Sequence, residues 1–185
     1  MIRRKYIMNI YVLLKKTFDT EDKIVINDGV IEDDGVEYII NPYDEYAIEE
    51  AINQRDEHGG EVTVVTIGDS DSEQQLRTAL AMGADKAVLI NTEDDLEDGD
   101  QTTTMQILEA FFEDKEVDLI LAGNVAIDEA SGQVGPRIAE KLDMAYVTTI
   151  VDLEIEDGVA KIDKDVEGDI EKVEAPLPLL VTCQQ

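Results

Sequence analysis

Short apolar runs that alternate with helix-like segments are the feature that most constrains the fold of this chain. Apolar strands are predicted at 9–15, 61–67, 86–90 and 117–122. Helices with apolar residues at helical spacing are predicted at 42–57, 72–82, 101–113 and 133–142. This alternation predicts an α/β fold with a parallel sheet and helices on both faces. Such sheets bind ligands beyond the carboxyl ends of their strands, where the strand order reverses, and the turn after 117–122 is such a place.

An antiparallel insertion is predicted between the first strand and the first helix. Residues 23–26 and 36–40 flank two turn signals, Asn27-Asp28-Gly29 and Asp33-Asp34-Gly35. Turns of this composition favour a β-hairpin, so the two segments are expected to pair with each other.

The last quarter of the chain predicts further antiparallel strands. From Ala145 the apolar residues alternate toward the turn Asp157-Gly158, and a further strand follows Gly168. Pro176 and Pro178 indicate an edge position, or the entry into a final strand. The fold class is therefore a parallel α/β sheet with antiparallel hairpin additions.

Length and charge limit the classes of protein. With 185 residues, the chain is expected to form one domain over 8–185, preceded by a disordered extension at 1–7. The formal net charge of −29 argues against nucleic acid and anionic membranes as partners. No apolar run approaches the roughly 18 residues that span a bilayer. The acidic runs at 32–34, 93–100 and 113–116 are interpreted as solvated turns and helix ends, since they lack calcium-loop spacing.

The segment Ala126-Ile-Asp-Glu-Ala-Ser-Gly-Gln-Val-Gly-Pro-Arg137 carries the main binding signal. It joins an apolar strand to an amphipathic helix, and such a junction presents free N–H groups and the positive end of the helix dipole. Gly132 and Gly135 permit close approach of a ligand, and Pro136 suits the first helical turn. A nucleotide site and glycines used only for packing remain about equally supported.

A second segment, Asn41-Pro42-Tyr43-Asp44-Glu45-Tyr46, opens the first helix. Asn41 is a natural N-cap, Pro42 suits the first helical position, and acids occupy the first turn. Helix capping explains each of these residues, so a purely structural role is the better interpretation of this segment by itself.

Autonomous catalysis finds little support. His58 ends a predicted helix, where a cation is favourable. Cys183 is the only cysteine, which excludes a disulfide framework and fits a reducing cytoplasm, and its apolar strand predicts a core or edge thiol. Neither a nucleophile elbow nor a P-loop is present. The chain is therefore predicted not to be an enzyme by itself, and any redox work depends on a cofactor.

Three motifs in order resemble the β subunit of electron transfer flavoprotein. They are Asn-Pro-Tyr-Asp-Glu-Tyr-Ala-Ile-Glu-Glu-Ala from 41, Leu-Arg-Thr-Ala-Leu-Ala-Met-Gly-Ala-Asp from 76, and Ala-Ile-Asp followed by Gly-Gln-Val-Gly-Pro. The resemblance extends from Met8 to the last residue. It implies a Rossmann-like domain that binds AMP in a mainly structural role. It also implies a heterodimer with an α subunit, which holds most of an FAD shared at the interface.

The resemblance also implies the residues around the nucleotide. They are Leu13, Asn41, Pro42, Tyr43, Asp44, Ile67, Ala126, Ile127, Asp128, Ser131, Gly132, Gln133, Val134, Gly135 and Arg137. Asp128 and Glu129 do not suit a position beside a phosphate, because a carboxylate there costs on the order of 1 kcal/mol. Asp128 is therefore expected to face ribose hydroxyls or to cap its own turn. Arg137 is the natural counter-charge for phosphate, although an exposed salt bridge explains it equally well.

Two departures from the family limit what the resemblance implies. Relatives continue beyond Gln185 with a loop that docks partner dehydrogenases and a tail that embraces the α subunit, so docking through that loop is expected to be lost. The loop at 17–20 would approach the flavin. Some relatives have tyrosine where this chain has Thr20.

The implied function is electron transfer from acyl-CoA and related dehydrogenases to the respiratory chain, as in fatty acid β-oxidation, in the cytoplasm. One alternative within the family is the bifurcating type, in which β binds a second FAD in place of AMP. Another is an adenine-nucleotide module resembling universal stress proteins, although their Gly-rich phosphate signature is absent. A structural subunit with an empty pocket is the simplest alternative.

Overall fold

The structure is a computed structural model that describes residues 7–19, 21, 23–28, 30–32, 35–94 and 99–184. Apart from Ile7, which is exposed and lies before the first strand, the predicted N-terminal extension is outside these residues. Thr20, in the loop that was expected to approach the flavin, is outside them as well. In the described part of the chain, no helix combines the length and the apolar composition needed to cross a membrane.

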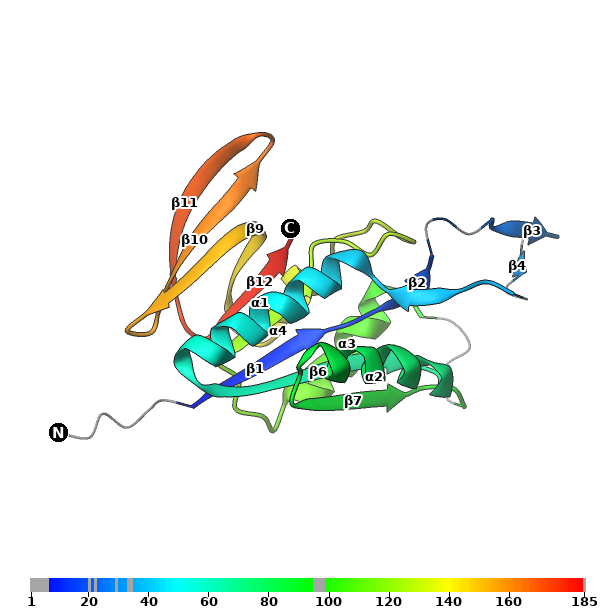
Figure 1. Ribbon diagram of the computed structural model, residues 1–185, viewed down its shortest axis with the longest axis horizontal. Helices are drawn as coiled ribbons and strands as arrows, with labels where there is room; N and C mark the ends of the chain where they lie inside the picture. Colours follow the sequence, from blue (N-terminus) through cyan, green and yellow to red (C-terminus); the bar gives the residue numbers. More distant parts are fainter. Residues whose placement is uncertain are drawn as a thin grey trace.

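The main sheet has the strand order β11-β10-β9-β12-β8-β1-β6-β7. Its strands are β1 (Met8–Leu13), β6 (Gly60–Gly68), β7 (Lys86–Asn91), β8 (Leu119–Gly123), β9 (Ala145–Glu156), β10 (Val159–Val166), β11 (Asp169–Pro176) and β12 (Leu179–Cys183). Neighbours from β9 to β7 pair in parallel, whereas β10 and β11 are antiparallel. The parallel sheet with antiparallel additions is confirmed, and the β10–β11 hairpin extends beyond the body of the molecule (Figure 1).

Helices cover both faces of the parallel strands, as predicted. They are α1 (Pro42–His58), α2 (Glu73–Met82), α3 (Gln101–Phe112) and α4 (Val134–Lys141), with a short 3₁₀ turn, η1 (Ser70–Ser72). Apolar residues of α1 and α2 share one core cluster, and those of α3 and α4 share the other. Strand side chains alternate between the clusters. On β12, for example, Leu179 and Val181 belong to the first cluster and Leu180 to the second.

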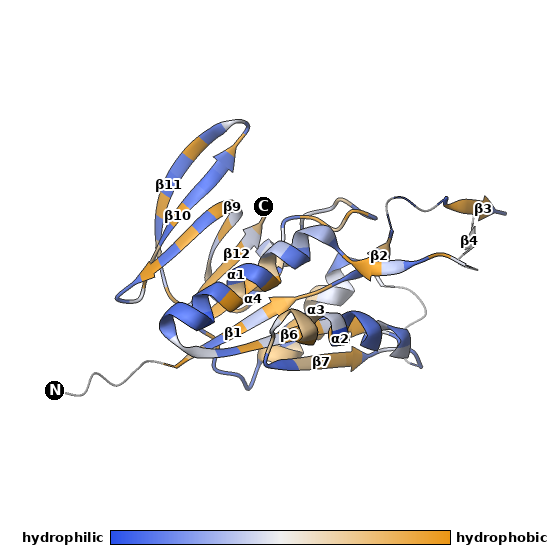
Figure 2. Ribbon diagram, viewed as in Figure 1, coloured by the Kyte–Doolittle hydropathy of each residue, from blue (hydrophilic) through white to orange (hydrophobic). Residues whose placement is uncertain are grey.

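Local sequence explains where α1 begins and ends. Pro42 occupies the first turn together with Asp44 and Glu45, where negative charge favours the helix dipole. Gly59 follows the last residue with φ of 82°, a conformation that glycine adopts without steric cost, and its N–H donates to the Arg55 carbonyl at 2.7 Å. The hairpin strands β10 and β11 are much more polar than β1, which lies in the middle of the sheet (Figure 2).

The predicted hairpin insertion is wrong in its pairing. β3 (Val25–Asn27) does form a hairpin, but with β4 (Val30–Glu32) across the Asn27–Val30 turn. β5 (Tyr38–Ile40) instead pairs with β2 (Lys16–Phe18), which follows β1 after a two-residue break at Leu14 and Lys15. A contact between Phe18 and Tyr38 accompanies this pairing, with ring centroids 5.0 Å apart. The strand predicted at 9–15 is β1, which ends two residues earlier, at Leu13, and β2 was not predicted.

Pro176 and Pro178 suggested an edge position or the entry into a final strand, and the structure has both. Pro176 is the last residue of β11, the strand at one edge of the sheet, and Pro178 directly precedes β12. β12 itself lies in the interior of the sheet, parallel to both β9 and β8. Its residues are buried throughout. Both prolines are tolerated, because Pro176 ends an edge strand and Pro178 comes before the first residue of β12.

Candidate functional site

A pocket of about 300 Å³ lies at the carboxyl ends of the parallel strands. The chain runs from β1 to β6 and β7 on one side, then returns to β8 on the other side of β1. The strand order thus reverses between β1 and β8, and the pocket opens at this point. A cavity therefore lies at the position predicted for ligand binding, beyond the strand that precedes Ala126.

Most of the residues implied for the nucleotide gather in this pocket. Those that line it are Leu13, Asn41, Asp44, Ile67, Ala126, Ser131, Gly132, Gln133, Val134 and Gly135. The others lie next to it or turn away, and they are Pro42, Tyr43, Ile127, Asp128 and Arg137. The strand ends and the 126–135 segment therefore meet as expected, although some neighbouring side chains serve other contacts.

Asn41 and Asp44 form a buried clasp on the α1 side of the pocket. Asn41 is 1% exposed, and its Nδ2 donates to Asp44 Oδ1 at 3.0 Å and to the Val125 carbonyl at 2.9 Å. Its Oδ1 accepts the Ile127 N–H at 3.2 Å. Asn41 is the N-cap residue of α1, as predicted, and its carbonyl accepts the Asp44 N–H at 2.8 Å, but its side chain makes no capping bond. Its amide holds the loop after β8 against α1.

The Asp44 carboxyl joins the two strands at which the order reverses. It accepts the N–H of Lys15 at 2.8 Å and the N–H of Gly123 at 2.9 Å, at the ends of β1 and β8. Burial raises the pKa of Asp44 to about 7, and the three hydrogen bonds it accepts limit that rise. Gly123 is required here because a Cβ would overlap the Asp44 carboxylate and lie 2.7 Å from Tyr43 Cβ.

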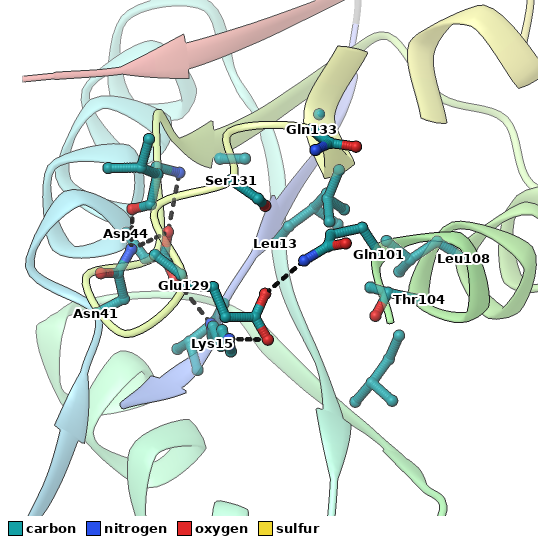
Figure 3. A pocket seen from close by; sticks show the side chains of 18 of the residues that line it. Leu13, Lys15, Asn41, Asp44, Gln101, Thr104, Leu108, Glu129, Ser131 and Gln133 are labelled. Carbon is teal, nitrogen blue, oxygen red and sulfur yellow. Dashed lines mark hydrogen bonds and ion pairs between the residues drawn. The ribbon is translucent and has the colours of Figure 1, made fainter. Parts of the chain in front are cut away.

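An exposed bridge crosses the pocket on the opposite side, and it was not foreseen from the sequence. Lys15 Nζ lies 3.2 Å from Glu129 Oε1, and Gln101 Nε2 donates to Glu129 Oε2 at 3.0 Å (Figure 3). Lys15 Nζ also pairs with Asp128 at 2.9 Å. Asp128 thus faces a lysine in this structure. The bridge connects the end of β1, the 124–133 loop and the first residue of α3.

The other lining residues were not among those implied for the nucleotide. They are Leu14, Lys15, Val65, Gly68, Thr92, Gly99, Gln101, Thr104, Ile107, Leu108, Ala122, Gly123, Asn124, Val125 and Glu129. Lys15, Gly68 and Thr92 directly follow or end parallel strands, so the rule that ligands bind at carboxyl ends could have identified them. Gln101 lies next to the acidic run interpreted as a solvated turn. Asp100 in that run caps α3, accepting the N–H groups of Thr102 and Thr103 at 2.9 Å.

The first turn of α4 forms another wall of the pocket. Gln133, Val134 and Gly135 line it, so the N-terminal end of α4 faces the cavity. Gly135 also serves packing, since a Cβ there would lie 2.9 Å from Thr182 Cγ2 on β12. Arg137, expected as a counter-charge, donates instead to the Thr102 hydroxyl at 2.8 Å and borders a separate surface recess. Within this segment, Gly135 both packs against β12 and lines the pocket.

The remaining titratable candidates lie apart from the pocket. Cys183 is buried on β12, which confirms a core thiol, and burial raises the pKa of this thiol. His58 is the last residue of α1, as predicted. Among the described residues, no group of three His, Cys, Asp or Glu side chains is arranged to hold a metal ion.

Comparison with known proteins identifies similar sequences. The sequence model described as "Electron transfer flavoprotein domain" matches residues 28–185. "Electron transfer flavoprotein subunit beta" of Bacillus subtilis is 61% identical over 96% of this chain and 69% of its own length. The caffeyl-CoA reductase-Etf complex subunit CarD of Acetobacterium woodii is 40% identical over 95% of this chain and 68% of its own. The acryloyl-CoA reductase electron transfer subunit gamma of Anaerotignum propionicum is 37% identical over 96% and 68%.

Proposed function

This chain belongs to the electron transfer flavoprotein family as a β-type subunit, and from that premise we propose that it binds AMP in the pocket between β1 and β8. In this proposal an α subunit shares an FAD with it at their interface. The pair carries electrons from acyl-CoA and related dehydrogenases to the respiratory chain in the cytoplasm. The β chain then acts as a nucleotide-stabilised scaffold and provides no catalytic side chain.

The position and lining of the pocket carry this proposal. Leu13, Ile67 and Leu108 provide apolar walls that suit an adenine ring. The start of α4, with Ser131 and Gly132 before it, provides N–H groups and the positive end of a helix dipole for a phosphate. Asn41, Asp44 and Ala126 border the part between them, where the ribose would lie. The donor set therefore fits an adenine mononucleotide.

The other residues implied for the nucleotide support this arrangement indirectly. Ile127 and Pro42 flank the Asn41 clasp, and Tyr43 packs close to Gly123. Asp128 holds Lys15 at the pocket rim. We propose that Gln133, Val134 and Gly135 contact the nucleotide directly, whereas Arg137 acts only through α4 and its bond to Thr102.

A second candidate is a bifurcating-type subunit that binds FAD in place of AMP. The names of the relatives from caffeyl-CoA and acryloyl-CoA reductase systems favour it, because those proteins serve other electron-transfer complexes. The size of the pocket favours AMP, since about 300 Å³ is small for a dinucleotide.

The test is to purify the chain without added nucleotide, record its visible spectrum, then denature it and chromatograph what is released. AMP near one per chain without flavin absorbance supports the proposal, and stoichiometric FAD supports the second candidate. If nothing is released, the α partner and AMP are added. Continued absence of nucleotide would refute AMP binding.

A matched pair of variants ties the released nucleotide to this pocket. Thr104→Trp places an indole in the cavity from the first turn of α3, and Thr78→Trp places one on the exposed face of α2. We expect Thr104→Trp to lose the nucleotide and Thr78→Trp to keep it. Equal retention by both variants would place the nucleotide elsewhere.

A further inference from the structure

The β3–β4 hairpin is an apolar arm that lies outside the core of the protein. β3 and β4 pair only with each other, and neither strand contributes a described residue to the two core clusters. The hairpin lies at the end of an arm that extends from the body beyond β2 and β5 (Figure 1), and β3 is strongly apolar (Figure 2). The core therefore does not explain why this segment is apolar.

Three consecutive apolar side chains of the arm face water. Ile24, Val25 and Ile26 are 47%, 38% and 64% exposed. Because side chains alternate along a strand, Ile24 and Ile26 share one face and Val25 lies on the other, so both faces are apolar. Single exposed apolar side chains are ordinary, whereas a contiguous group marks an interaction surface. A two-stranded hairpin of this length is also only marginally stable in water by itself, so a partner that covers it would stabilise it.

The charge around the arm limits the kind of partner. From 19 to 37 the sequence has one basic residue, Lys23, and its acids are Asp19, Glu21, Asp22, Asp28, Glu32, Asp33, Asp34 and Glu37. An apolar centre with a polar rim is the usual anatomy of a protein interface, and charges across an interface are complementary. The matching surface is therefore an apolar cleft rimmed by Lys and Arg. A second copy of this chain would bring the same acids and a further net charge of −29, so it is disfavoured.

We propose that the β3–β4 hairpin docks, through Ile24, Val25 and Ile26, in an apolar cleft rimmed by basic residues on the α subunit. This inference rests on the proposed function, which supplies the α partner, and it adds the surface through which β recognises that partner. Because the described part of the arm lies outside the core, recognition of the partner is separable from folding of the β chain.

The test measures the affinity of the full β chain for purified α subunit by calorimetry, together with urea unfolding of the β chain alone. The double variant Ile24→Thr, Ile26→Thr removes one apolar face of the hairpin but keeps residues that favour strands. We expect it to bind α about tenfold more weakly and to unfold at the same urea concentration as the wild type. Leu80→Gln, which removes an exposed apolar side chain from α2, is the matched control and should change neither quantity. Higher salt should slow the association of the wild type with α.

Each other result overturns a defined part of the argument. If the wild type binds α and the double variant binds it equally well, the arm is not the contact, and the inference fails while the α partnership stands. Earlier unfolding of the double variant would give the arm a structural role, and equal weakening by Leu80→Gln would make the loss unspecific, so either result overturns the inference. Association that does not respond to salt would exclude the basic rim. Self-association of the wild type that the double variant abolishes would make a second copy the occupant instead. If the wild type does not bind α at all, the proposed heterodimer fails, and the inference fails with it.

Discussion

Two polar networks flank the same pocket, and they differ mainly in burial. The clasp of Asn41 and Asp44 is 1% and 5% exposed, whereas Lys15 and Glu129 in the bridge have side chains 39% and 45% exposed. Lys15 belongs to both, through its backbone N–H to Asp44 and its Nζ to Glu129. Polar groups that are buried therefore stabilise the fold, whereas similar groups that are exposed make contacts that water can replace at little cost.

The largest expected effect comes from breaking the buried clasp. Asp44→Ala leaves the N–H groups of Lys15 and Gly123 without their acceptor, which should lower the free energy of unfolding by about 4 kcal/mol at pH 5.5. Urea denaturation measures it. Glu45→Ala is the control, since Glu45 is exposed in the same helical turn, and should cost less than about 0.5 kcal/mol. Similar losses in both variants would show that the clasp contributes no special stability.

The pH dependence of the free energy of unfolding tests whether Asp44 in the clasp is as strongly buried as the structure indicates. Its folded pKa, about 7, lies above the ordinary value of 3.8, so folding favours the protonated carboxyl. The stability it contributes is complete below the unfolded pKa and is lost as the pH rises through the folded pKa. Between pH 5 and 8, the wild type should lose about 3 kcal/mol relative to Asp44→Asn. A constant difference between the two unfolding free energies would contradict the raised pKa.

Overpacking the clasp should have a smaller effect. Gly123→Ala places a Cβ against the Asp44 carboxylate and 2.7 Å from Tyr43 Cβ, so α1 and the end of β8 must separate. We expect a loss of about 2 kcal/mol, measured by thermal or urea unfolding. A variant as stable as the wild type would mean that α1 shifts here without cost, and the clasp would no longer count as rigid.

The smallest effect on stability is expected on the exposed side. Lys15→Met removes the ion pairs to Asp128 and Glu129 but keeps the backbone N–H that Asp44 accepts. The free energy of unfolding should change by less than about 1 kcal/mol, because exposed ion pairs contribute little. A loss as large as that of Asp44→Ala would show that the bridge, like the clasp, is part of the architecture.

Local signals in the sequence predicted the parallel part of the fold. Alternating apolar runs and helix caps are short-range features, so the helices and the strands around the pocket were predicted at nearly the right residues. The interior position of β12 and the pairing of β5 with β2 were missed. Both depend on contacts between distant segments, which short-range patterns in the sequence do not specify.

The candidate site was predictable where a residue follows a strand. Leu13, Ile67 and Ala126 line the pocket because parallel strands end at one edge of the sheet. The contacts of a side chain were harder to predict from the sequence. Asn41, for example, has the pattern of an N-cap, but its side chain contacts the loop at 125–127. Gln101 was missed because its neighbour Glu129 is 28 positions away in sequence.

The interior position of β12 determines when the main sheet can be completed during synthesis on the ribosome. When synthesis has reached Pro176, the strands β9, β10 and β11 exist, but the strand that connects them to β8 has not been made. The Asn124 N–H, beside the pocket, still lacks the Cys183 carbonyl that it will bond at 2.8 Å. The nascent chain therefore holds two unjoined pieces of sheet with open edges, which is the condition in which chains aggregate. The addition of five buried residues, Leu179–Cys183, closes both edges in one step, and only then can the Asn124 N–H beside the pocket find its acceptor.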